Sequence, residues 1–226
     1  PEQMEMMQAL AVENPDMLIQ SHVSENVNEV AWVKDLCPKA KDYTDAYAQY
    51  GLVRPRAIYG HGIHLTDREL SVFSETGAAV AHCPTSNFFL GSGCLNVKKL
   101  RDKNRPVHVG LATDLGAGTS FSMLQTMNEA YKAAQINGTP YTSLHSFYLA
   151  SRGTAEALGL QDKIGTIAVG MEADLMVLNL KSTPIIDYRM KYAKDLEEAL
   201  FIQMTLGDDR AIAATYVAGK EVYRAN

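Results

Sequence analysis

The chain has 226 residues, 46% of them hydrophobic, so it can bury one substantial core, or one core with an appendage. Its formal net charge of −5 and the absence of a long lysine or arginine run argue against a dedicated nucleic-acid or membrane-surface binder. Three widely spaced cysteines without a CxxC pair disfavour a zinc knuckle or a disulfide framework, and no apolar run reaches about 18 residues. We expect a cytoplasmic protein with a small or neutral ligand.

The beginning of the chain, Pro1-Glu2-Gln3-Met4, has neither an initiator methionine nor a basic-then-apolar signal pattern. This start predicts that the sequence is cut from a longer one.

Residues 1–160 alternate short apolar runs with longer amphipathic stretches. Strands are predicted at 17–22, 56–61, 78–82 and 106–112, and helices at 2–13, 26–37, 42–50, 66–77, 120–136 and 142–158, with a loop at 84–93 and a short helix ending near 103. Four strand–helix units with apolar strands predict a parallel sheet covered by helices. A closed (β/α)8 barrel needs eight such units, so the fold class is α/β, the second half of a TIM-like barrel.

The pattern changes after Leu158. Short β segments are predicted at 164–170, 173–180 and 213–223, with a helical stretch near 192–201. We expect residues 161–226 to form a small C-terminal β appendage with a linking helix.

Polar side chains follow the ends of the four predicted strands: His22, His61, His82 and Asp114. The carboxyl ends of the strands form the active-site face of a (β/α)8 barrel, so these residues are expected on one face.

His22 and Glu25 are three residues apart. An imidazole at a strand end can bind zinc, and a neighbouring carboxylate can carry protons beside the metal. Taken by itself, the spacing is more typical of a core histidine beside a solvated glutamate.

His61 lies between two glycines, which let the backbone pass closely and leave the ring free to reach a ligand. Asp114 follows a buried strand and precedes a glycine-rich loop, where it could bind zinc and accept a proton from its water. The alternatives are an incidental turn histidine and an aspartate that caps a helix or forms an Asx turn.

Taken together, His22-x-x-Glu25, Gly60-His61-Gly62, Ala81 to Asn87 and Thr113-Asp114 resemble the amidohydrolase superfamily, in the order of its fifth to eighth strands. The stretches at 92–96, 122–124 and 206–210 are similar to the guanine deaminase branch, and 164–174 resembles the superfamily's return to its β appendage. The likeness spans nearly the whole chain.

The resemblance implies hydrolytic deamination of guanine to xanthine and ammonia by a cytoplasmic homodimer with one Zn²⁺ per subunit. His22 and Asp114 would be zinc ligands, and His22, Glu25 and Asp114 would contact the purine. Glu25 would be the proton shuttle, Asp114 would take a proton from the water, and His61 would orient that water.

The superfamily's first strand supplies a His-x-His pair of zinc ligands, and no such pair occurs in this sequence. Since a catalytic zinc has at least three protein ligands, the chain is either a portion of a longer enzyme or inactive as it stands. Two other functions stay open: a sibling amidohydrolase acting on another aminated or chlorinated heterocycle, and a non-catalytic assembly module. His82 and Cys83 are expected to pack or shape a loop, and His64, His108 and His145 to be structural.

Overall fold

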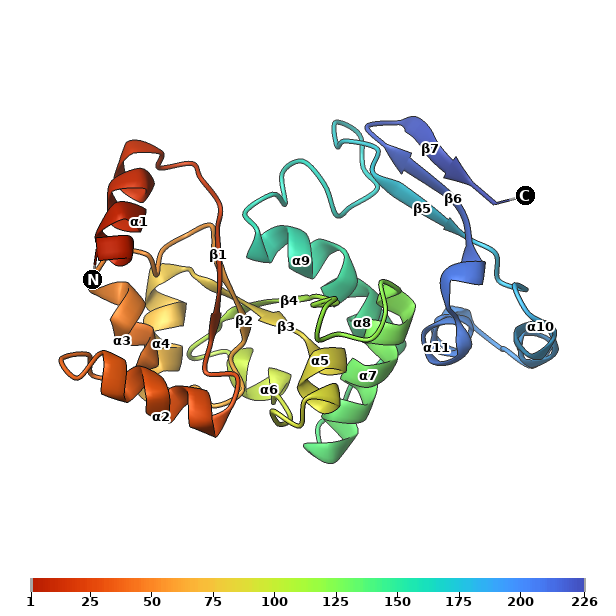
Figure 1. Ribbon diagram of the computed structural model, residues 1–226. Helices are drawn as coiled ribbons and strands as arrows, with labels where there is room; N and C mark the ends of the chain where they lie inside the picture. Colours follow the sequence, from red (N-terminus) through yellow and green to blue (C-terminus); the bar gives the residue numbers. More distant parts are fainter. Residues whose placement is uncertain (1, 226) are drawn as a thin grey trace.

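The computed structural model describes residues 2–225 (Figure 1). Its centre is a four-stranded sheet in the order β1 (Ile19–Val23), β2 (Ala57–His61), β3 (Ala79–His82) and β4 (His108–Leu111), and every neighbouring pair is parallel. Strand order follows chain order, as in half of a (β/α)8 barrel. The predicted α/β class and partial barrel are confirmed.

Helices connect and cover the strands. They are α1 (Glu2–Glu13), α2 (Val27–Leu36), α3 (Tyr43–Ala48), α4 (Asp67–Thr76), α5 (Pro84–Phe89), α6 (Val97–Leu100), α7 (Met123–Ile136), α8 (Ser143–Ala150) and α9 (Arg152–Ala157). The capping box predicted at Thr66 and Glu69 is present, and α4 ends at Gly77, whose φ of 72° is left-handed.

Two helical predictions were wrong in detail. The segment predicted as a loop contains α5, in which Pro84 occupies the first turn, where its missing N–H is not needed. The single helix predicted at 142–158 is two helices that meet at Ser151, whose φ of −127° and ψ of −94° are not helical. Helix α5 was missed because its segment is rich in residues that favour loops. The break at Ser151 was missed because the helical spacing of apolar residues continues across it.

The two faces of the sheet carry different side chains. Tyr59, Val80 and Val109 share one register row and are all buried, and the Tyr59 ring packs edge-on against Phe73 of α4 at 5.5 Å between centroids. The opposite face presents the row His22, Gly60, Ala81 and Gly110. The first row belongs to the core, and in the second row Gly60 and Gly110 leave room for the ring of His22 and for Thr154 of α9.

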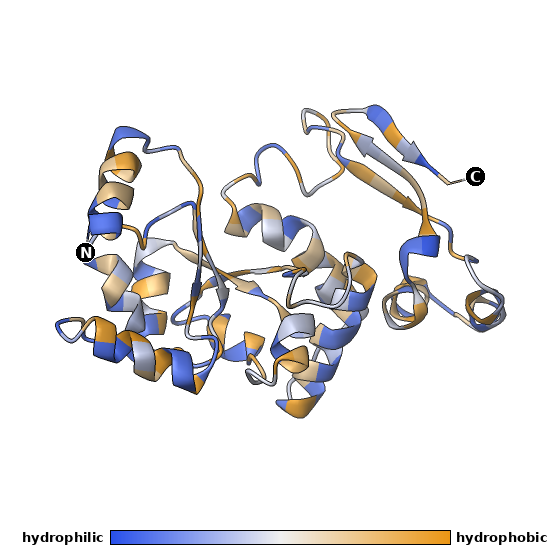
Figure 2. Cartoon of the chain, viewed as in Figure 1, coloured by the Kyte–Doolittle hydropathy of each residue, from blue (hydrophilic) through white to orange (hydrophobic). Residues whose placement is uncertain are grey.

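A second, antiparallel sheet contains β5 (Leu175–Leu178), β6 (Ile212–Val217) and β7 (Lys220–Arg224), and lies apart from the parallel sheet in Figure 1. Its β5 strand is hydrophobic along its length (Figure 2). The helices α10 (Pro184–Met190) and α11 (Leu196–Leu206) precede β6, and α11 packs against α7 and α8. We propose that residues 1–160 and 161–226 are two structural units.

The expectation of a β segment at 164–170 was wrong, whereas the one at 213–223 was right in type but holds two strands. Residues 164–170 form turns and coil, with Ile167 and Val169 exposed, because no neighbouring strand in residues 2–225 pairs with them. Residues 213–223 contain a hairpin, which turns at Ala218 and Gly219, both with positive φ. None of the helices in residues 2–225 combines the length and hydropathy that crossing a bilayer requires.

A buried carboxylate ties α3 to α4. Glu69 is 2% exposed; its Oε1 accepts hydrogen bonds of 3.1 Å from the backbone N–H and the hydroxyl of Thr44. Its Oε2 accepts hydrogen bonds of 2.8 Å from the same two groups of Thr66. The capping glutamate of α4 therefore also holds the start of α3, and both helices lie over the outer face of β2.

We expect Glu69→Ala to lower the free energy of unfolding by about 2–4 kcal/mol, because it leaves the buried N–H and hydroxyl groups of Thr44 without an acceptor and removes the capping-box contacts to the exposed Thr66. Equilibrium unfolding in urea measures the change. Glu75→Ala, at an exposed position of the same helix, is the matched control and should change stability by less than about 0.5 kcal/mol. Equal effects from both variants would contradict the proposed role of the carboxylate.

Candidate active site

The site begins with a close contact between β1 and β2. His22 pairs in register with Gly60, and a Cβ at Gly60 would lie 3.1 Å from Cδ2 of the His22 ring. The rings of His22 and His61 meet edge to face, with centroids 4.8 Å apart. A glycine at position 60 therefore lets the His22 ring lie over the neighbouring strand.

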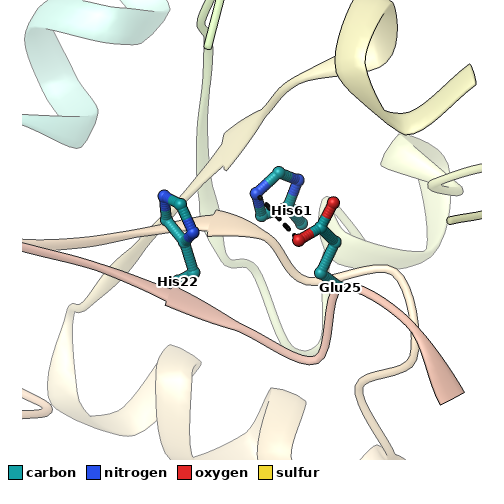
Figure 3. A group of neighbouring side chains, drawn as sticks. All are labelled: His22, Glu25 and His61. Atoms are coloured by element: carbon teal, nitrogen blue, oxygen red, sulfur yellow. Dashed lines mark ion pairs between the residues drawn. The ribbon is translucent and has the colours of Figure 1, made fainter. Parts of the chain in front are cut away.

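His61 is the buried centre of the site. Tyr59, two residues earlier, points toward the helices, whereas the φ of 71° at His61 departs from strand geometry. The His61 ring is 1% exposed, and its Nε2 lies 3.7 Å from Glu25 Oε2 and 3.8 Å from Asp114 Oδ2 (Figure 3 shows the glutamate). Two predicted site residues thus converge on one nitrogen of a third.

Left-handed backbone conformations mark three of the strand ends. Ser24, His61 and Asp114 have φ values of 49°, 71° and 48°, although none is glycine. Such conformations cost roughly 1–2 kcal/mol each and are found where the surrounding structure enforces them, often at functional sites.

The turn after β4 fixes the backbone of Asp114. The N–H of Gly118 donates to the Asp114 carbonyl at 2.6 Å, and a Cβ at Gly118 would lie 1.9 Å from the carbonyl oxygen of Thr113. Only glycine fits this turn. The Thr85 hydroxyl of α5 donates to the same Thr113 carbonyl at 3.1 Å, so the loop is held from two sides.

Two residues that sequence reasoning gave no role complete the site. Asn87 Oδ1 lies 2.8 Å from His61 Nδ1, and the Ser92 hydroxyl donates to Glu25 Oε1 at 2.9 Å. Both lie in segments that the sequence marked only by family resemblance.

The donors that converge here suit zinc. Ligand atoms of His22, Glu25 and His61 lie within 4.8 Å of one another, as do those of His61, Cys83 and Asp114. Imidazole nitrogen and carboxylate oxygen are usual zinc ligands, and the buried His61 Nε2 has no hydrogen-bond partner. The residues therefore fit a metal ion. His22 belongs to the first group and Asp114 to the second, and His61 belongs to both.

Cys83 is the least suitable member of these groups. Burial raises the pKa of its thiol to about 12, and its Sγ donates to the Ala81 carbonyl at 3.3 Å. Since the thiolate is the form that binds metal, a protonated Cys83 is a poor ligand.

The other histidines of the barrel half lie outside both groups. His64 Nε2 lies 3.0 Å from the Ser92 carbonyl oxygen, His145 contacts the Arg101 guanidinium, and His108 is exposed on β4. His82 is buried with both ring nitrogens lacking hydrogen-bond partners. Burial, aided by the charge of His61, lowers the pKa of His82 to about 3.

The folded state keeps His82 neutral, whereas the unfolded chain protonates it below its ordinary pKa of 6.5. Stability is therefore lost as pH falls from 6.5 toward 3, at about 1.4 kcal/mol per pH unit. In urea unfolding at pH 7 and pH 5, His82→Leu should reduce the difference between the two stabilities by about 2 kcal/mol. An unchanged difference would show that His82 does not titrate in this way.

Comparisons with known proteins give one consistent family for the chain. The model of the amidohydrolase family matches residues 1–222. Guanine deaminase from Escherichia coli (strain K12) is 47% identical over 226 residues, which are 100% of this chain and 51% of that protein. The solved structure of E. coli guanine deaminase matches with a TM-score of 0.97 and 47% identity, over 100% of this chain and 53% of its own.

Two further solved structures contain bound ligands. Guanine deaminase from C. acetobutylicum, with bound guanine in the active site, has a TM-score of 0.84 and 31% identity, covering 97% of this chain and 52% of its own. An adenosine deaminase from Xanthomonas campestris with bound zinc has a TM-score of 0.80 and 26% identity, covering 96% of this chain and 48% of its own.

The chain spans about half the length of the curated relatives that it matches. Within that span the match is continuous, and the strand ends and glycine-dependent turns described above all fall inside it. The chain belongs to the amidohydrolase family.

Proposed function

We propose that the natural full-length protein hydrolyses guanine to xanthine and ammonia. The observation that carries the proposal is the convergence of Glu25 and Asp114 on His61 Nε2, in a chain 47% identical to the E. coli guanine deaminase. The guanine-bound relative supports the choice of purine. A cytoplasmic homodimer is part of the same proposal, on the family resemblance.

One zinc ion per subunit belongs to this proposal. His22 and Asp114 of this chain would bind it, together with the His-x-His pair that the family's first strand supplies; the zinc-bound relative supports the metal. When bound, zinc lowers the pKa of a coordinated water toward about 7. Residues 1–226 alone, with two proposed ligands, are expected to be inactive.

Protons would move through two side chains of this chain, and a third would orient the water. Asp114 accepts the proton of the attacking water, and His61 Nε2, between the two carboxylates, orients that water toward C2 of guanine. Glu25 delivers a proton to ring nitrogen N3, so that negative charge does not build up on the purine. The amino group at C2 then takes the proton held by Asp114 and leaves as ammonia, while the remaining proton of the attacking water passes to Glu25, so that both carboxyl groups regain their starting states and one water is consumed.

The alternative substrate is another heterocycle with an amino or chloro leaving group, because the similarity extends to the adenosine deaminase. The strand-end residues would perform the same proton transfers on either ring. The higher identity to guanine deaminases favours guanine.

The first experiment measures ammonia release from guanine by the full-length protein, with and without a zinc chelator, and identifies the product by chromatography. Xanthine formation that the chelator abolishes and added zinc restores is the expected result. Release from adenosine or an aminated triazine, but not from guanine, would replace the substrate. No release from any of these by zinc-loaded protein would contradict the function.

Substitutions separate proton transfer from metal binding. Glu25→Gln should keep zinc bound and lower kcat at least about 100-fold, because only the proton shuttle is lost. Asp114→Ala should lower both the zinc content and the activity. Zinc is measured by atomic emission and turnover by ammonia release, with the exposed Glu75→Gln as control. Near-normal turnover in Glu25→Gln would refute the assigned role.

A further inference from the structure

The end of α5 connects the two central site residues. The helix closes at Leu90, and Gly91 follows with a φ of 70°. The N–H of Gly91 donates to the Phe88 carbonyl at 3.2 Å, and the N–H of Ser92 donates to the Asn87 carbonyl at 2.9 Å. This pair of hydrogen bonds is the Schellman motif, which fixes Asn87 and Ser92 relative to each other.

Asn87 determines which nitrogen of His61 carries a proton. Its Oδ1 can only accept, so the 2.8 Å contact with Nδ1 requires a proton on Nδ1. In the neutral ring, Nε2 then presents its lone pair to the space beside Glu25 and Asp114. Asn87 is 1% exposed, so water does not compete for the contact.

Ser92 holds the carboxylate of Glu25. Its hydroxyl donates to Oε1 at 2.9 Å, while Oε2 lies 3.7 Å from His61 Nε2. Two contacts fix the loop around Ser92. The carbonyl oxygen of Ser92 lies 3.0 Å from His64 Nε2, and the backbone at Gly93 packs so closely on Ile63 that a Cβ there would lie 2.9 Å from it. The serine hydroxyl therefore has a fixed position from which to orient Glu25.

We propose that Asn87 and Ser92 are paired positioning residues, with Asn87 setting the tautomer of His61 and Ser92 setting the side-chain orientation of Glu25. The Schellman motif at the end of α5 links the two residues, so the His61 tautomer and the Glu25 orientation depend on the same helix end. The effect on turnover rests on the function proposed above, whereas the tautomer does not depend on the substrate.

The tautomer test uses imidazole ¹⁵N NMR on the full-length zinc-loaded protein. His61 should show a protonated Nδ1 and an unprotonated Nε2, and Asn87→Asp, which keeps an acceptor oxygen, should preserve this pattern. Asn87→Leu should lose it. Asn104→Leu, the same change in an exposed turn, is the matched control. An unchanged His61 pattern in Asn87→Leu would overturn the role of Asn87.

The orientation test is kinetic. Ser92→Ala should lower kcat about 10- to 100-fold, as loss of a residue that orients a site group does, with a much smaller change in KM and no loss of zinc. Ser92→Thr, which restores the hydroxyl, should recover most of the rate. Ser71→Ala, which removes a hydroxyl from α4, is the control. Equal kcat in Ser92→Ala and the parent, or no recovery in Ser92→Thr, would overturn the role of Ser92.

The two tests separate the two proposals. If the protein does not deaminate guanine but Asn87→Leu alters the His61 pattern, the substrate assignment fails and the positioning role of Asn87 stands. If guanine is deaminated and neither variant has an effect, the positioning proposal fails alone. Should Asn87→Leu fold poorly, the Ser92→Ala and Ser92→Thr pair still decides the role of Ser92 by rate.

Discussion

The arrangement of the whole site depends on the register of the parallel sheet. Register places His22, Gly60, Ala81 and Gly110 in one row on the same face. His22 has the only large side chain of the row, and its ring lies against Gly60, with Cδ2 3.1 Å from the position that a Cβ at residue 60 would occupy. A shift of one residue would exchange the two faces and bring the core row of Tyr59 to the site.

Much of this could be predicted from the sequence because the relevant signals were local. The capping box of α4, its glycine end and the four apolar strands were visible as short patterns, and so were the polar residues that follow the strands. The break at Ser151 and the irregular segment at 164–170 were not, because spacing reports amphipathicity and not the presence of a neighbouring strand.

Asn87 and Ser92, which contact the site residues, could not be predicted from local sequence patterns for a different reason. Asn87 contacts a residue 26 positions away and Ser92 one 67 positions away. No periodicity encodes such contacts; they follow from how a helix end is oriented over the sheet. His22, Glu25, His61 and Asp114 could be proposed from the sequence because each lies at or just after the end of a strand, and strand ends share one face of a barrel.

The Schellman end of α5 also has a consequence for heat inactivation. This helix has six residues, too few for independent stability, and its last turn holds both contacts at once. Local opening of that turn would release the histidine and the glutamate in a single event, while the sheet below stays folded. Activity would then disappear at a lower temperature than tertiary structure, and the gap between the two temperatures would report the strength of one helix terminus.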